Sequence, residues 1–305
     1  MGSMTDLEDF SLPVGAWDSH VHVVDEDKFP LHPYHPYRPK KADLDDLLSF
    51  QRKQGIAHSC LVAFSVYHTD NSSILDGLRR LRGKGRAVVC IDPETVTDEE
   101  LQELHNAGAR AIRLNLNTRG QQLDKAGYTK LLGMNAHRIR PLGWAIQMYV
   151  SLDQIAQLAP IVPTLGVPVI FDHLGHPDPS RGPVQLQEGY EEFMDLLRSK
   201  QVWTKLSGTY RFEGLVGLED YVREILSIAP DHVVWASDWP HSGGVEANPG
   251  GDRNIPQAYR KIDDQTWVAR CKAWCREVEG SSGQKLVRKL WVDNPRRLWQ
   301  YDTDD

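Results

Sequence analysis

The sequence predicts one α/β domain, a (β/α)8 TIM barrel. Eight short segments rich in apolar and β-branched residues recur along the chain, and each is followed by a segment whose apolar residues have helical spacing. Strands that are apolar on both faces and separated by helices form parallel sheets. The 305 residues are enough for such a barrel, which needs roughly 250. A doubly wound open sheet is the alternative, but no glycine-rich phosphate loop follows any of these strands.

The predicted strands and helices alternate with few interruptions. The strands cover residues 16–24, 56–64, 86–91, 109–116, 144–150, 167–171, 202–206 and 232–236. The helices cover residues 42–53, 71–82, 97–107, 128–140, 152–160, 190–199, 218–228, 264–278 and 284–290. The third helix has a marked start, because Thr97 and Glu100 have the spacing of a capping box. We expect residues 16–305 to form the barrel and residues 1–15 to be an N-terminal tail.

Composition narrows the classes of partner and the location. The formal net charge of −7 argues against nucleic acid or an anionic membrane surface as the partner. No apolar run is long enough to span a membrane, and the polar, acidic N-terminus is not a signal peptide. The four cysteines are too few for a disulfide framework. We therefore expect a small-molecule partner and a reducing, cytoplasmic location.

Two segments near the ends of the barrel have no predicted helix or strand. Residues 25–41 contain four prolines, which disfavour regular structure, and they follow the first strand directly. Residues 243–254 follow the last strand and contain two Gly-Gly pairs and Pro249. Active sites of parallel barrels lie at the C-terminal ends of the strands. Both segments are therefore expected to cover or reshape a pocket.

Two histidines lie near the end of the first predicted strand, in the run AWDSHVHVV over residues 16–24. Side chains two residues apart point to the same face of a strand, so His20 and His22 converge on one point. Such a pair can hold a metal, polarise a carbonyl or carry a proton. By itself the pair is a weak signal, since one of the two can be a hydrogen-bonded core residue.

Polar residues at other strand ends share the mouth of the predicted barrel. The further candidates are Ser65, Arg113, Arg119, Gln147, Tyr149, Asp172, His173, His176, Lys205, Arg211, Asp238 and His241. Individually, Asp238 could cap a helix, Arg113 could form a surface ion pair and Asp172 could be a structural partner of nearby backbone. Together, three histidines and one aspartate from three strands, surrounded by arginines suited to carboxylates, indicate an active site.

These segments resemble the amidohydrolase superfamily. The motifs that carry the resemblance are HVH at residues 20–22, DHLG at residues 172–175 and DWPH at residues 238–241. Within the superfamily, the chain is similar to the branch that contains 2-pyrone-4,6-dicarboxylate lactonase. The segments RLN at residues 113–115, KLSG at residues 205–208 and DNPRRL at residues 293–298 also fit this branch. The resemblance covers nearly the whole chain.

The resemblance implies hydrolysis of a carboxylated lactone, or a related cyclic ester, on a (β/α)8 barrel. It gives Asp238 the role of general base. The donors to the developing oxyanion would be His20, His22 and His173. The substrate-binding candidates are the arginines Arg113, Arg119 and Arg211, which would hold substrate carboxylate, together with Ser65, Tyr149, His176 and His241.

The metal content stays open at this point. Zinc sites of the superfamily commonly use a histidine from strand five, where this chain offers Gln147 and Tyr149, as in the metal-free lactonase pattern. His20, His22, His173 and Asp238 still number four, which is enough for one zinc. We therefore expect no cofactor or one weakly held zinc.

The number of carboxylates on the substrate and the type of reaction also stay open. His176 stands where the dicarboxylate lactonase pattern has an arginine, which favours a substrate with fewer carboxylates. A zinc-dependent decarboxylase or other lyase on the same barrel is the second hypothesis, and a non-catalytic binding barrel is the third. The third is the weakest, because both the base and the arginines are present. A homo-oligomer is also open, since Trp267, Trp274 and Trp291 could pack on the barrel or on a second subunit.

Overall fold

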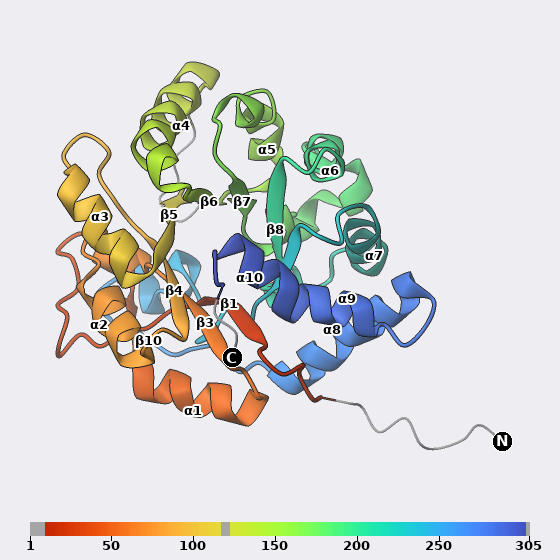
Figure 1. The fold of residues 1–305 in the computed structure, drawn as a ribbon, viewed down its shortest axis with the longest axis horizontal. Helices are drawn as coiled ribbons and strands as arrows, with labels where there is room; N and C mark the ends of the chain where they lie inside the picture. The colour runs from red at the N-terminus through yellow and green to blue at the C-terminus, as the bar shows by residue number, and fades with distance from the viewer. Residues whose placement is uncertain (1–9, 117–122, 303–305) are drawn as a thin grey trace.

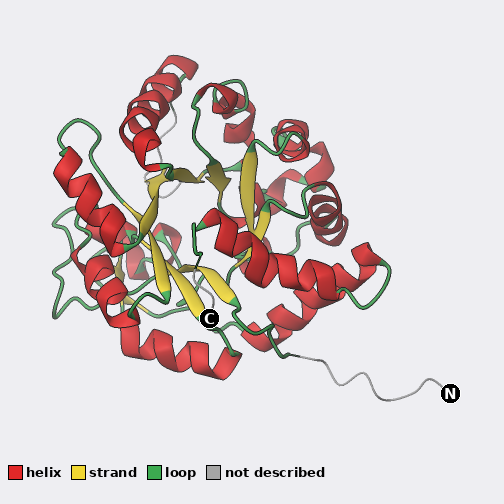
Figure 2. Ribbon diagram, viewed as in Figure 1, coloured by secondary structure: helices red, strands yellow, loops and turns green. Residues whose placement is uncertain are grey.

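The computed structural model describes residues 10–116 and 123–302. Eight parallel strands form one sheet in the order β1-β3-β4-β5-β6-β7-β8-β9, and helices surround it (Figures 1 and 2). The strands are β1 (Trp17–Val21), β3 (His58–Val62), β4 (Gly85–Val89), β5 (Ala109–Asn115), β6 (Ala145–Tyr149), β7 (Val169–Phe171), β8 (Val202–Leu206) and β9 (Val233–Trp235). The predicted TIM barrel is confirmed, and each of these eight strands lies in or within one residue of a predicted one.

The first and last strands meet and close the ring. A parallel bridge joins Val21 to Trp239. The backbone amide of His22 donates to the Trp239 carbonyl at 2.9 Å, and the amide of Asp238 donates to the His20 carbonyl at 3.1 Å. The two segments that carry the histidine pair and the predicted base are therefore held side by side by their own backbones.

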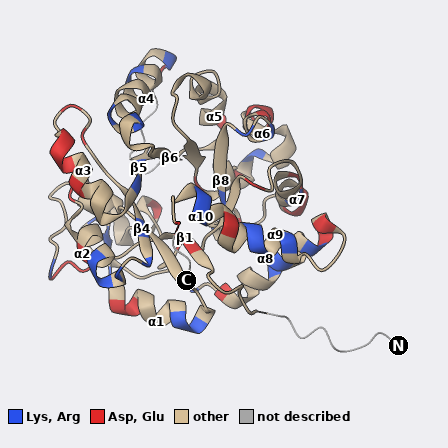
Figure 3. Ribbon diagram, in the orientation of Figure 1, with Lys and Arg blue, Asp and Glu red and all other residues tan. Residues whose placement is uncertain are grey.

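The helices form the outer layer. They are α1 (Leu44–Gln54), α2 (Ser72–Leu81), α3 (Asp98–Ala107), α4 (Lys125–Ile139), α5 (Leu152–Leu158), α6 (Tyr190–Arg198), α7 (Leu218–Ile228), α8 (Asp264–Glu279), α9 (Gln284–Arg288) and α10 (Asn294–Leu298). The predicted capping box at Thr97 and Glu100 is present at the start of α3. Helix α1 has acidic residues in its first turn and basic residues in its last, which complements the helix dipole (Figure 3).

A separate apolar cluster fills the barrel interior. It includes Trp17 of β1, Trp203 of β8, and Trp299 and Tyr301 of the C-terminal segment. The Tyr301 ring packs on Trp17 at the start of β1, with ring centroids 5.0 Å apart. The C-terminal segment thus covers the N-terminal end of the barrel, and the strand C-termini remain for a site. Because side chains alternate along a strand, the residue two positions after Trp203 also points inward, and that residue is Lys205.

Residues 25–41 differ from the prediction in one detail. A two-residue strand, β2 (Arg38–Pro39), pairs in parallel with β10 (Pro256–Gln257). Proline is tolerated in a short edge pairing, where its missing N–H is not needed. This pairing ties the proline-rich segment to the segment that follows β9.

Two other predicted segments are more structured or shorter than expected. Residues 243–254 contain two short 3-10 turns, Val245–Ala247 and Pro249–Gly251. The predicted helix over residues 284–290 ends at Arg288, because a π-helical turn follows before α10 begins.

The three tryptophans of the C-terminal helices pack on the barrel. Trp267, Trp274 and Trp291 are buried in the core, with exposed fractions of 8%, 2% and 0%.

All four cysteines are buried. Among the helices of residues 10–116 and 123–302, none is both long and apolar enough to cross a membrane.

Candidate active site

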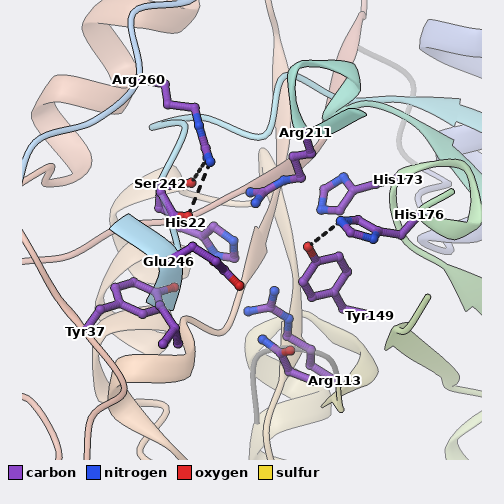
Figure 4. Close-up of a pocket in the computed structure, with 14 residues that line it drawn as sticks. His22, Tyr37, Arg113, Tyr149, His173, His176, Arg211, Ser242, Glu246 and Arg260 are labelled. Atoms are coloured by element: carbon purple, nitrogen blue, oxygen red, sulfur yellow. Dashed lines mark hydrogen bonds between the residues drawn. The ribbon is translucent and has the colours of Figure 1, made fainter. Parts of the chain in front are cut away.

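A cavity of about 240 Å³ opens beyond the C-terminal ends of the strands (Figure 4). Its lining is mainly polar. The lining side chains are those of His22, Tyr37, Arg113, Asn115, Tyr149, His173, His176, Arg211, Ser242, Val245, Glu246 and Arg260. The structure therefore brings together at one cavity many of the predicted site residues, from both halves of the chain.

The remaining predicted residues do not line this cavity within the described part of the chain. Arg119 falls in residues 117–122, outside the described residues. Ser65 contacts the lining indirectly, because its hydroxyl accepts a hydrogen bond from Asn115 at 2.6 Å. His241 lies against the Tyr210 ring, and its Nε2 is 3.2 Å from a carboxylate oxygen of Asp264.

Asp238 is buried next to the lining histidines. One of its carboxylate oxygens accepts hydrogen bonds, and the other has no donor in the described part of the chain. Its Oδ2 accepts hydrogen bonds from the Tyr210 hydroxyl at 2.5 Å and from Arg211 Nη2 at 2.7 Å. Its Oδ1 has no hydrogen-bond donor among the described residues and lies 3.7 Å from His20 Nε2. Burial raises the pKa of Asp238. Arg211 and the neighbouring histidines lower this pKa by more than burial raises it, so it lies well below its usual range. Asp238 is therefore ionised, with Oδ1 available to accept a proton.

A chain of close polar contacts runs through the histidine pair. Lys205 Nζ lies 3.2 Å from His20 Nδ1, His20 Nε2 lies 3.2 Å from His22 Nε2, and His22 Nδ1 lies 2.8 Å from the Val62 carbonyl. His20 Nδ1 also lies 3.3 Å from Asp172 Oδ1, so it has a donor and an acceptor beside it. A carbonyl can only accept, which assigns a hydrogen to Nδ1 of His22. The N–H of His22 is therefore directed to the backbone of β3 and away from the cavity.

Lys205 is fully buried and stands at the start of this chain. Its ammonium also donates to Gln147 Oε1 at 2.6 Å and lies 3.4 Å from Asp172 Oδ1, while Gln147 Nε2 donates to Asp172 Oδ2 at 2.9 Å. Burial raises the pKa of Asp172, but Lys205 and His20 bring it far below its usual range. Asp172 thus contacts buried side chains, which differs from the backbone role expected for it. Its carboxylate balances the charge of Lys205 beneath the site.

Arg113 carries a buried charge that faces the cavity. The residue is 8% exposed, and its Nη1 donates to the Ala63 carbonyl at 2.7 Å. Its Nε has no hydrogen-bond partner, and no carboxylate of the described residues forms an ion pair with it. Arg211, in contrast, is paired with Asp238. Because an unpaired buried charge is costly, Arg113 is suited to an anionic ligand.

Some residues at the site were not predicted to act there. Tyr37 and Glu246 lie in the two segments that were expected to cover or reshape a pocket, but nothing in the sequence singled out either residue. Arg260 lies outside both segments. Lys205 was a candidate at its strand end, and its position two residues after an inward-facing tryptophan agrees with its place in the barrel. Tyr210 precedes the predicted Arg211, but its bond to Asp238 depends on the turn after β8.

Three donor atoms at the site have the spacing of a metal site. One nitrogen of His20, one of His22 and a carboxylate oxygen of Asp238 lie within 4.8 Å of one another. The separation of 3.2 Å between the two Nε2 atoms suits nitrogens each about 2.0–2.1 Å from zinc. Arg211 and Tyr210 hold only Oδ2 of Asp238, and its Oδ1 has no donor among the described residues. His20, His22 and Asp238 could therefore hold a metal ion, which would take the place of the hydrogen bond between the two histidines.

Comparisons with known proteins agree with this architecture. The family model described as "Amidohydrolase" matches residues 17–300. The chain is 30% identical to a 2-pyrone-4,6-dicarboxylate hydrolase of Comamonas testosteroni over 304 residues, covering 95% of this chain and 92% of that protein. It is 28% identical to a 4-sulfomuconolactone hydrolase of Hydrogenophaga intermedia, covering 95% of this chain and 90% of that protein.

Solved structures show the same fold. A Pseudomonas putida protein provisionally named a 2-pyrone-4,6-dicarboxylic acid hydrolase matches with a TM-score of 0.76 and 27% identity, over 96% of this chain and all of that chain. A Burkholderia multivorans amidohydrolase solved with bound zinc matches with a TM-score of 0.61 and 15% identity, over 93% of this chain and 99% of that chain. The second likeness supports the fold alone. The chain belongs to the amidohydrolase family and is an enzyme of the amidohydrolase superfamily.

Proposed function

We propose that this enzyme hydrolyses a small carboxylated lactone or related cyclic ester. The observation that carries the proposal is the unpaired, buried Arg113, which faces the same cavity as the histidines next to Asp238. An anion bound at Arg113 would place the rest of a small substrate against this cluster. Two relatives are named a 2-pyrone-4,6-dicarboxylate hydrolase and a 4-sulfomuconolactone hydrolase. These names support a substrate of this kind.

The geometry supports carboxylate binding mainly by arginine. Arg113 can offer a carboxylate the guanidinium hydrogens that the Ala63 carbonyl leaves free, and Arg119 remains a proposed second contact. His176 accepts or donates a hydrogen bond with the Tyr149 hydroxyl at 2.9 Å. Burial lowers the pKa of His176 to about 4, and Arg211 adds to the shift, so the ring is neutral at neutral pH. A neutral ring cannot replace an arginine as a carboxylate partner, which favours fewer carboxylates than in the dicarboxylate relative.

In the proposed reaction, Asp238 Oδ1 takes a proton from a water that attacks the lactone carbonyl carbon. Arg211 and Tyr210 hold the other oxygen and so fix the direction of the carboxylate. The tetrahedral oxyanion then collapses, the ring C–O bond breaks, and the proton passes to the leaving alkoxide to give a hydroxy acid.

The three histidines have different proposed parts around the oxyanion and the water. The Nδ1 of His173 lies 2.8 Å from the Ser207 hydroxyl, which leaves its Nε2, 3.8 Å from Asp238 Oδ2, as a donor toward the cavity. The only N–H of His22 is used by Val62. His173 is therefore the favoured oxyanion donor, while His20 and His22 surround the water. Ser65 and His241 are proposed to support the lining through Asn115 and Tyr210.

We propose that this chemistry is independent of metal, because β6 offers Gln147 and Tyr149 where zinc sites of the superfamily commonly have a histidine. The experiment is a pH-stat assay on a panel of mono- and dicarboxylated lactones, with and without a chelator, using the native enzyme and Asp238→Asn. Turnover should resist the chelator and fall by ~10²–10⁴-fold in the variant. Loss of turnover to chelator and recovery with zinc would overturn metal independence. Carbon dioxide release without ring opening would favour the lyase, and no turnover of any lactone would refute the proposal.

A further inference from the structure

Glu246 brings a carboxylate into a cavity whose other charged lining residues are arginines. The residue follows β9, lies at the mouth and points into the cavity (Figure 4). Within residues 10–116 and 123–302, no donor forms a hydrogen bond or ion pair with its carboxylate. The proposed hydrolysis uses no group at this position. Glu246 is exposed, so its carboxylate can exchange solvent for a hydrogen-bond donor of a ligand.

The backbone around Glu246 is fixed on both sides. The buried side chain of Gln257 donates to the Gly244 carbonyl at 2.8 Å and to Asn248 Oδ1 at 2.7 Å. Asn248 in turn donates to the Pro36 carbonyl at 3.1 Å. Arg260 donates to the Ser242 carbonyl just before this turn. The carboxylate therefore extends from a short turn that is held two residues before it and two residues after it.

Among the described lining residues, Arg113, Arg260 and the exposed Glu246 have no ion-pair partner. The charge of Arg211 is balanced by Asp238. Arg260 donates to two backbone carbonyls of the 243–254 segment and its neighbour, where it acts as a clamp. Arg113 uses only Nη1 in such a bond, so Arg113 and Glu246 are the charged lining groups with the most hydrogen-bonding capacity left for a ligand. A ligand that binds to both residues carries a carboxylate for Arg113 and, at another position, a hydrogen-bond donor for Glu246.

We propose that Glu246 determines specificity by accepting a hydrogen bond from a substrate hydroxyl and repelling a second carboxylate. The preferred substrate class is then a lactone with one carboxylate and at least one ring or side-chain hydroxyl. This inference rests on the proposed function, because it concerns the same cavity. It departs from the substrate named for the Comamonas relative, which is a dicarboxylate.

The test compares lactones that differ only at one substituent, which is a hydroxyl, a hydrogen or a second carboxylate. Values of kcat/KM are measured for the native enzyme, Glu246→Gln and a control, Glu191→Gln, at an exposed position of α6. Hydrogen bonds to charged groups contribute enough for Glu246→Gln to lower kcat/KM on the hydroxylated lactone by ~10-fold or more. Removal of the like charge should raise kcat/KM on the dicarboxylated lactone by ~10-fold or more. The control should leave both unchanged.

Binding separates this inference from the proposed reaction. Cyclic ethers with the same substituents have no ester carbonyl and cannot be hydrolysed, so calorimetry reads their Kd directly. Opposite shifts in Kd for the hydroxylated and dicarboxylated ethers in Glu246→Gln support the inference, even if no lactone is turned over and the proposed function fails. Equal changes for all ligands, or none, overturn the inference even if the enzyme is a lactonase.

Discussion

Replacement of Lys205 by methionine tests the buried network beneath the site. Lys205 and Asp172 have no exposed surface, and Lys205 supplies the only cation within 4 Å of Asp172 among the described residues apart from the His20 ring. Methionine fills most of the volume but leaves the carboxylate with the single hydrogen bond from Gln147. Breaking a buried pair by removing one partner costs about 3–5 kcal/mol. We expect Lys205→Met to lower the free energy of unfolding by that amount.

Thermal unfolding followed by tryptophan fluorescence measures this loss. At an unfolding entropy of about 2.1 cal/mol/K per residue, 3–5 kcal/mol corresponds to a fall in Tm of about 5–8 °C for a chain of 305 residues. The double variant Lys205→Met/Asp172→Asn removes both charges and should recover most of the loss, and Lys285→Met, at an exposed position of α9, is the matched control. A Tm of Lys205→Met within 1 °C of the native value, or a double variant no more stable than the single one, would refute the reasoning.

Two further predictions concern stability. Because burial holds the pKa of His176 at about 4, against 6.5 for an ordinary histidine, the unfolded chain binds this proton first as the pH falls. Its contribution to stability is therefore lost between about pH 6.5 and pH 4, by up to about 3 kcal/mol, and urea unfolding of His176→Gln should lack this part of the pH dependence. An identical pH profile in the variant would contradict the burial argument. At Gly189, φ is +88° and an added Cβ would overlap the Leu152 carbonyl, whereas Gly182, with φ of +81°, has open space. Gly189→Ala should lose about 1–3 kcal/mol more than Gly182→Ala in the same assay, and equal losses would count against the overlap.

The fold followed from short-range features of the sequence. Strands such as His58–Val62 and Val202–Leu206 are apolar runs bounded by helices, so their pattern specified a parallel barrel directly. The convergence of His20 and His22 also followed from the two-residue period of a strand. Their joint contact with Asp238 followed from the rule that strand C-termini share one end of a barrel.

The finer features of the site depended on three-dimensional detail. The N–H of His22 is used by Val62 because β3 lies beside β1 in that register, which no motif records. Glu246 enters the cavity because Gln257 clamps a turn several residues away in the chain. Burial of Arg113 without a carboxylate partner depends on the packing of β5 against its neighbours. Such features arise from long-range contacts and were open until the structure placed them.

The central claim is that Arg113 binds the carboxylate of a lactone that Asp238 helps to hydrolyse. The most direct measurement compares kcat/KM for a carboxylated lactone and its carboxamide analogue, which has the same shape without the charge. Loss of a buried charge pair costs about 2–5 kcal/mol, so the native enzyme should prefer the carboxylate by roughly 30-fold or more. In Arg113→Met this preference should disappear. Equal kcat/KM for the two lactones in the native enzyme, or an undiminished preference in Arg113→Met, would contradict the account.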